Sequence, residues 1–173
     1  MNLLSRKWTA ILLMAVPFWA NAQKGIELKD PSGKIQLNVM LGNTVTYSVS
    51  HGEDVIIETS PISMTLTDGT VFGKEPRLKK KKYRTENQMI YPPIYRKQSI
   101  KDHFNELTLD FKGGYSLVFR AYEDGVAYRF ISDLKKPFMV ESEQAVFNMP
   151  NNQKVFAATP KGRKIDGVEN QMG

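Results

Sequence analysis

Apolar and polar residues alternate with a period of two between residues 34 and 50, and this pattern constrains the fold more than any other feature of the chain. Such alternation is typical of strands with one buried face, whereas helices repeat about every 3.6 residues. The pair Gly42-Asn43 interrupts the pattern and favours a two-residue turn. The segment therefore predicts a β-hairpin, with inward-facing Ile35, Leu37, Val39, Leu41, Val45, Tyr47 and Val49.

Further strand patterns, separated by turn residues, follow along the chain. Residues 55–58 are expected to form a strand that ends at Ser60-Pro61, and Asp68-Gly69 and Gly113-Gly114 are additional turn pairs. Outside the first 22 residues, no window of useful length has a helical period. The sequence predicts an all-β domain packed as two sheets.

The formal net charge of +6 comes mainly from residues 74–101, which hold ten basic and two acidic side chains. This segment contains three prolines and little alternation, so we expect a long loop with one strand near residues 85–90. The lysine run 79–82 is expected to be solvated. Because no nucleic-acid motif accompanies these charges in an exported chain, we expect no nucleic-acid partner.

The stretch GGYSLVFRAYEDGVAYRFIS, residues 113–132, places two arginines among residues typical of a sheet core. If Asp124-Gly125 forms a two-residue hairpin turn, Arg120 lies directly opposite Arg129. A three-residue turn that includes Glu123 places them on opposite faces instead. Both faces of the hairpin are largely apolar, which is typical of strands covered on both sides.

Arginines opposed on one covered face require a negative group between them. We therefore expect Arg120 and Arg129 to form structural ion pairs with a carboxylate such as Glu141 or Glu143, since buried arginine is normally paired. The alternative is that Arg120 and Arg129 serve docking or ligand binding.

The N-terminus has the order of segments found in a secretory signal. Arg6 and Lys7 precede an apolar stretch, residues 8–19, and Ala20-Asn21-Ala22 fits a cleavage site. The apolar stretch has about 12 residues, too few for a membrane span, which needs roughly 20. We predict a signal peptide over residues 1–22, a mature domain over 23–173, export to the periplasm, and no membrane span.

Few side chains in this chain suit catalysis or metal binding. The chain has no cysteine, which excludes disulfides and thiolate metal sites. His51 and His103 are too few for a zinc site, and Glu141 and Glu143 offer too few oxygens for calcium. No nucleophile-elbow motif is present. We expect no catalytic, cofactor-binding or metal-binding residue in this chain.

Three segments carry a family resemblance, and they occur in the family's order: ELKDPSGKIQLNV (27–39), SPISMTLTDG (60–69) and FNELTLDFKGGYSLVFRAYEDGVAYRFIS (104–132). They resemble the N-terminal domain of glycoside hydrolase family 97, over roughly residues 25–150. Ser63 stands where the family pattern has glycine.

The resemblance implies a galactose-mutarotase-like two-sheet super-sandwich, incomplete at the C-terminus because the sequence ends at Gly173. In the family this domain precedes a (β/α)8 barrel that hydrolyses α-glycosides, as in α-glucosidases and α-galactosidases. The barrel supplies the catalytic carboxylates, and a calcium ion lies near the substrate. The resemblance thus implies a non-catalytic part of an exported α-glycosidase. Its partners are the barrel of the same polypeptide and, in the full-length enzyme, an α-linked oligosaccharide.

Two other functions remain open from the sequence. In a free-standing carbohydrate-binding module, Tyr83, Tyr91 or Tyr95 would stack on sugar rings, although both tryptophans lie in the predicted signal peptide. In a protein-interaction domain, the lysine run 79–82 would contact the partner.

Overall fold

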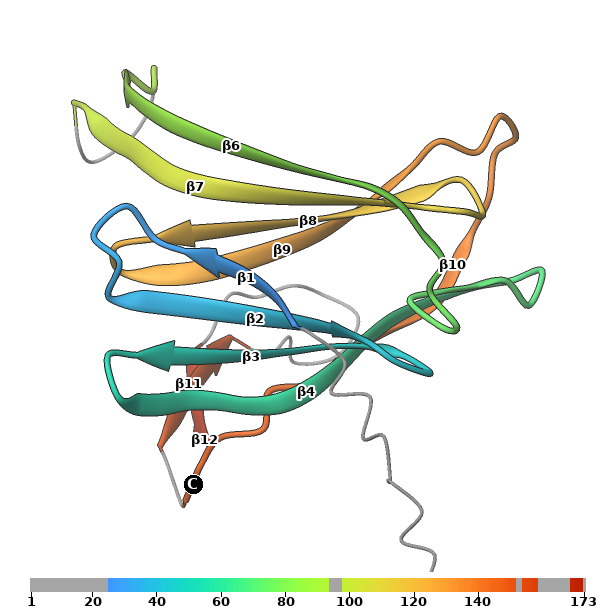
Figure 1. Ribbon diagram of the computed structural model, residues 1–173, viewed down its shortest axis with the longest axis horizontal. Helices are drawn as coiled ribbons and strands as arrows, with labels where there is room; N and C mark the ends of the chain where they lie inside the picture. Colours follow the sequence, from blue (N-terminus) through green and yellow to red (C-terminus); the bar gives the residue numbers. More distant parts are fainter. Residues whose placement is uncertain (1–24, 94–97, 152–153, 159–168, 173) are drawn as a thin grey trace, which may run out of the picture.

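The computed structural model describes residues 25–93, 98–151, 154–158 and 169–172 (Figure 1). The predicted signal peptide lies outside these ranges. In the described part of the chain every regular element is a strand, and no helix is long and apolar enough to cross a membrane. The all-β prediction is confirmed.

The first sheet has the strand order β1-β2-β3-β4-β10, with β5 paired to β4. Its strands are β1 (Ile26–Lys29), β2 (Ile35–Leu41), β3 (Val45–His51), β4 (Asp54–Leu66), β5 (Val71–Phe72) and β10 (Val140–Ala145). The second sheet has the order β6-β7-β8-β9. It comprises β6 (Leu78–Ile90), β7 (Ile100–Phe111), β8 (Tyr115–Tyr122) and β9 (Gly125–Ser132). A separate antiparallel pair joins β11 (Val155–Ala158) and β12 (Glu169–Met172).

The two main sheets face each other as the layers of a sandwich (Figure 1). Strand β1 lies over β7, and β2 lies over β8. The core between them is formed by the inward side chains of alternating residues, as a half-buried strand requires. Its fully buried large side chains include Leu37, Val39, Tyr47, Ile62, Leu66, Phe72, Leu107, Leu109, Phe111, Leu117 and Phe119.

The hairpin predicted over residues 34–50 is confirmed, because β2 and β3 pair from Ile35↔His51 to Leu41↔Val45. The connection is one residue longer than expected, since Thr44 lies outside both strands. Thr44 instead forms an isolated bridge with Lys74.

The expected end of a strand at Ser60-Pro61 is wrong, because β4 continues through both residues to Leu66. Pro61 pairs with Thr46 of β3, whereas pairing with β10 reaches only Ile62. Because the pairing of β4 with β10 ends at Ile62, the missing N–H of Pro61 removes no hydrogen bond between these two strands. A proline is tolerated at such a place. Ser63 also lies inside β4, and its Oγ donates to Gln144 Oε1 at 3.2 Å.

The basic segment is not a loop at the lysine run: residues 79–82 belong to β6, which pairs with β7 from Leu78↔Phe111 to Ile90↔Ile100. The strand expected near residues 85–90 is confirmed as the second half of β6. The sequence showed no alternation because β6 is an edge strand and nearly all of its residues are exposed. Lysines on an edge discourage pairing with other chains.

The register predicted for the 113–132 hairpin is wrong by two residues. The turn is Glu123-Asp124, so Tyr122 pairs with Gly125 and Arg120 with Ala127. Arg129 lies opposite Val118 instead of Arg120. The two arginines still share a face, but no other sheet of the described residues covers that face, and Arg129 is exposed.

Candidate functional site

The outer face of the second sheet, which points away from the first sheet, carries an ion cluster across three strands. Arg84 of β6 lies opposite Glu106 of β7, which lies opposite Arg120 of β8. The carboxylate of Glu106 therefore sits between two guanidinium groups. Arg120 Nε donates to Glu106 Oε2 at 2.8 Å, while Arg84 donates to both oxygens, at 2.9 and 3.1 Å.

Beneath these charges lies Phe104, which is only 1% exposed although it is on the outer face. The guanidinium carbon of Arg120 lies 4.1 Å from its ring centroid, and that of Arg84 lies 5.5 Å away. Tyr122 packs beside the same ring, with the centroids 5.2 Å apart. Cation–π contacts and the ion pairs thus hold both arginines over one aromatic ring. We call Arg84, Phe104, Glu106, Arg120 and Tyr122 the arginine cluster.

The arginine cluster determines the ionisation of its carboxyl group. Burial alone would raise the pKa of Glu106, but hydrogen bonds and positive charge from Arg84 and Arg120 outweigh burial and lower it. On the same face, the hydrogen bond from Lys82, at 2.9 Å, is the main cause that lowers the pKa of Asp110. Neither carboxyl group is suited to be a general acid, which needs a raised pKa.

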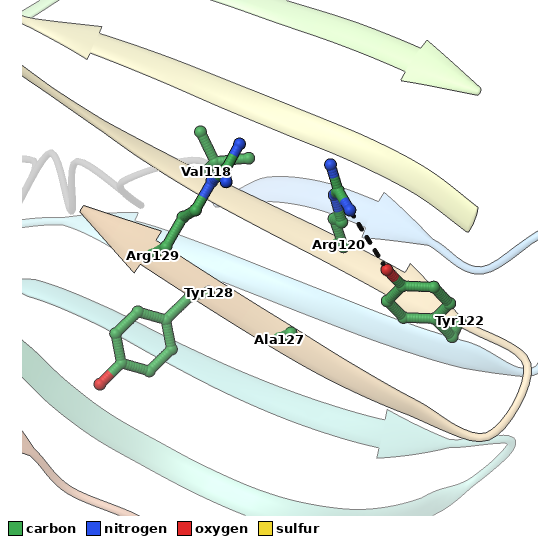
Figure 2. A pocket seen from close by; sticks show the side chains of 6 residues that line it. All are labelled: Val118, Arg120, Tyr122, Ala127, Tyr128 and Arg129. Atoms are coloured by element: carbon green, nitrogen blue, oxygen red, sulfur yellow. Dashed lines mark hydrogen bonds between the residues drawn. The ribbon is translucent and has the colours of Figure 1, made fainter. Parts of the chain in front are cut away.

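The expected carboxylate partners of the two arginines are wrong. Arg120 pairs with Glu106, and Arg129 has no ion pair among the described residues. Glu143 instead accepts a hydrogen bond from Tyr128 at 3.3 Å, on the inner side of β9. Figure 2 shows Arg120 and Arg129 projecting to one side of the hairpin and Tyr128 to the other.

Sequence reasoning missed Glu106, Arg84 and Phe104. With residues 79–84 assigned to a loop, Arg84 could not be placed opposite β7. One signal was available: Glu106 is a lone carboxylate between Phe104 and Thr108 in an alternating strand. A carboxylate at this position, on the same face of the sheet as the arginines, favours an ion pair with them.

Next to the arginine cluster, the outer face has a shallow hollow of about 150 Å³. Ligand pockets usually measure about 300–1,000 Å³ and converge several polar groups on one point. This hollow is smaller, and its guanidinium from Arg120 is already paired. Its lining residues are Val118, Arg120, Tyr122, Ala127, Tyr128 and Arg129 (Figure 2).

The described residues also do not assemble a metal site: they bring together no group of three His, Cys, Asp or Glu side chains that could hold a metal ion. Calcium takes six to eight oxygen ligands. The residues of the described ranges therefore do not fit the calcium ion that the resemblance implies.

The model of the glycosyl-hydrolase 97 N-terminal family matches residues 28–172. The chain belongs to this family. A retaining α-galactosidase of Bacteroides thetaiotaomicron is 36% identical over 168 residues, which cover 96% of this chain and 25% of the relative. A probable retaining α-galactosidase of Streptomyces bingchenggensis is 27% identical over 126 residues, and the match covers 19% of the length of that relative. The chain thus spans about a quarter of the length of these relatives or less.

Solved structures share the fold of this family-97 N-terminal chain. A glycoside hydrolase family 97 enzyme from Pseudoalteromonas sp. strain K8, in complex with acarbose, superposes with a TM-score of 0.71 at 21% identity. The match covers 85% of this chain and 24% of the enzyme. A β-arabinopyranosidase matches with a TM-score of 0.68 at 24% identity. This match covers 83% of this chain and 24% of the β-arabinopyranosidase chain. The predicted sandwich is confirmed.

In this family-97 chain, Arg120→Ala is expected to destabilise the fold by about 1–2 kcal/mol at neutral pH, because a charged hydrogen bond and a cation–π contact are lost. The pKa of Glu106 is lowered in the fold. Its ionic stabilisation is therefore present above the unfolded pKa of glutamate and is lost as the pH falls through the folded pKa. The difference between parent and variant should shrink on acidification.

Urea unfolding at several pH values measures this difference. The matched control is Arg129→Ala, whose side chain is exposed and unpaired among the described residues, and which should change stability by less than about 0.5 kcal/mol. Equal losses in both variants, or a loss from Arg120→Ala that is the same at every pH, would contradict the assignment of the ion pair.

Proposed function

We propose that the chain is the non-catalytic N-terminal sandwich of an exported α-glycosidase, which acts on an α-linked oligosaccharide. One observation carries the proposal: the chain matches only a quarter of a relative named as a retaining α-galactosidase. A glycosidase needs two carboxyl groups flanking the bond that it cleaves, one of them protonated in an inverting or retaining mechanism. Glu106 and Asp110, with lowered pKa values, do not supply such an acid.

In this proposal the catalytic carboxylates belong to a barrel on the same polypeptide, and the calcium ion lies near the substrate in the full-length enzyme. The sandwich supports that barrel. Export to the periplasm is supported by the order of basic, apolar and small residues over positions 1–22. Without cysteine, the exported domain depends on its core for stability.

Mass spectrometry of the native gene product tests both parts of the proposal. We expect a polypeptide about four times as long as this chain, as in the relative, with Gln23 as its first residue. Peptides from residues 23–173 should occur in one band together with peptides from a second region. The sequence of that region should alternate strand and helix patterns, as a barrel does. A product of the size of this chain alone would overturn the multidomain assignment. Retention of residues 1–22 in secreted protein would overturn export.

A further inference from the structure

A second hollow on the outer face of the second sheet has the size of a ligand pocket. It measures about 450 Å³, whereas ligand pockets usually measure about 300–1,000 Å³. It adjoins the smaller hollow and shares Val118 and Arg129 with it. Its lining also includes Lys82, Thr108 and Ser116, so all four strands of the sheet contribute to it. We call it the polar hollow.

The register of the sheet brings these side chains together. Lys82 of β6 lies opposite Thr108 of β7, and Thr108 lies opposite Val118 of β8. Val118 lies opposite Arg129 of β9, and both project to the same side of their hairpin (Figure 2). Opposite side chains on neighbouring strands start about 5 Å apart, so the four residues form one row across the sheet. Two long basic side chains therefore stand at the ends of a floor made of two short ones.

Two carboxylates that line the polar hollow are already paired with basic groups. Glu106 lies between the two guanidinium groups of the arginine cluster, which brings two positive charges for one negative charge. Asp110 accepts hydrogen bonds from Lys82 Nζ and Ser116 Oγ, each at 2.9 Å. Lys79 adds a further positive charge to the lining. Positive charge therefore exceeds negative charge around the hollow, and such a surface attracts anions.

The β9 side of the polar hollow presents a donor and an acceptor on either side of an apolar residue. Arg129 is exposed and has no ion pair among the described residues. Asp133 also lines the hollow, is exposed, and has no ion pair within the described part of the chain. Ile131, which is 38% exposed, lies between them in the sequence. A ligand on this side would meet the five N–H groups of a guanidinium, an apolar surface and a carboxylate.

We propose that the polar hollow binds a uronate residue of an acidic oligosaccharide. The uronate carboxylate accepts two parallel hydrogen bonds from the guanidinium group of Arg129, a geometry that makes such bonds strong and specific. The ring hydroxyls donate to Asp133 and exchange hydrogen bonds with Thr108, and the C–H groups of the ring lie on Val118 and Ile131. A ligand role for Arg129 is one of the two alternatives that are open from the sequence. Such binding is independent of the proposed function.

The mixed lining favours this class of ligand over others. Inorganic phosphate has no apolar surface to place on Ile131. An acidic peptide would pair with Arg129, but Asp133 would repel its carboxylates and would find no ring hydroxyl to bind. A neutral sugar would gain nothing from the excess positive charge. A uronate residue combines one carboxylate with several hydroxyls, and further uronates of the same oligosaccharide would reach the lysine run 79–82, which borders the hollow through Lys79.

Calorimetric titration of the native gene product with trimannuronate tests the polar hollow. The matched neutral probe is mannotriose, which has hydroxymethyl groups in place of the carboxylates. Because both probes are β-linked, they are not substrates of an α-glycosidase. At 0.15 M salt, which screens exposed charges beyond about 8 Å, we expect a dissociation constant of about 0.1–1 mM for trimannuronate and at least about tenfold weaker binding of mannotriose. Equal binding of the two probes, or no binding of trimannuronate at about 10 mM, would overturn the proposal.

Single substitutions locate the binding site. Arg129→Gln should weaken trimannuronate binding at least about tenfold, and Arg129→Lys should restore little of it because lysine lacks the planar fork. Asp133→Ala should weaken binding about threefold because the acceptor for a ring hydroxyl is lost, whereas attraction by charge alone would make binding stronger. Lys101→Gln removes one exposed charge at the far end of β7 and should leave binding unchanged.

Three further results would contradict uronate binding. The first is an equal effect of Arg129→Gln and Lys101→Gln, and the second is stronger binding by Asp133→Ala. The third is loss of selectivity, in which hexaglutamate binds as tightly as trimannuronate or an equal concentration of inorganic phosphate displaces it. These measurements involve neither the length nor the catalytic activity of the native product, so their outcome is separate from that of the proposed function.

Discussion

The isolated chain is expected to release no product from nitrophenyl α-glucosides or α-galactosides above the rate in buffer, with or without calcium. Enzymes accelerate such reactions by about 10⁶-fold or more, and this gain requires a positioned acid together with a base or nucleophile. On the outer face, Glu106 and Asp110 are both held ionised by basic neighbours. The rate enhancement should therefore be absent, not merely reduced.

A discontinuous assay with the purified mature chain measures the release of product from these nitrophenyl glycosides. The informative variants are Glu141→Gln and Glu143→Gln, the carboxylates of the exposed strand β10. Turnover that survives further purification and disappears in either variant would place an active site in this chain and would contradict the non-catalytic proposal. Turnover that is unchanged in both variants and is lost on further purification identifies a contaminating enzyme.

Phe72→Ala should destabilise the fold by about 3–5 kcal/mol, because a large buried ring is replaced by a cavity. Phe72 is 1% exposed and stacks on Tyr115 with ring centroids 4.5 Å apart. It also packs edge-on against Phe138 at 6.4 Å. The ring therefore joins the two-residue strand β5 to the second sheet, and its loss should loosen both.

Chemical unfolding followed by tyrosine fluorescence measures the loss. Phe147→Ala removes the same ring at a site that is 54% exposed and should cost less than about 1 kcal/mol. If Phe72→Ala does not fold, Phe72→Leu retains most of the volume and should show a smaller loss in the same direction. Similar stability of the Phe72→Leu, Phe147→Ala and parent proteins would show that Phe72 is not in the core.

Local pattern was sufficient for the hairpin of β2 and β3 and for the all-β class. Side chains alternate across a strand with a strict period of two, so one buried face is visible in the order of residues alone. Together with a two-residue turn, the same reasoning placed Arg120 and Arg129 on one face of their hairpin, and this part of the prediction is confirmed because a register shift of two residues leaves the faces unchanged.

Register itself depended on tertiary structure. Local turn preference favours Asp124-Gly125 over Glu123-Asp124, and the strands flanking them are apolar on both faces, so no local signal in the sequence indicated the observed pairing. In the folded sheet the turn is Glu123-Asp124, with Tyr122 opposite Gly125. On its other side β8 pairs with β7 over its whole length, from Phe104↔Tyr122 to Phe111↔Tyr115. That pairing places Arg120 beside Glu106.

The same distinction explains β6 and the arginine cluster. The sequence showed that residues 74–101 are basic and predicted that the lysine run 79–82 is solvated, which the exposure of β6 confirms. Only the folded sheet showed that the lysine run is a strand, because an edge strand is held by main-chain hydrogen bonds to β7 and leaves no apolar pattern in its side chains. Arg84 and Arg120 are 36 positions apart in the sequence. They share Glu106 because β7 lies between their strands, and this adjacency is a property of the sheet order, which local sequence does not encode.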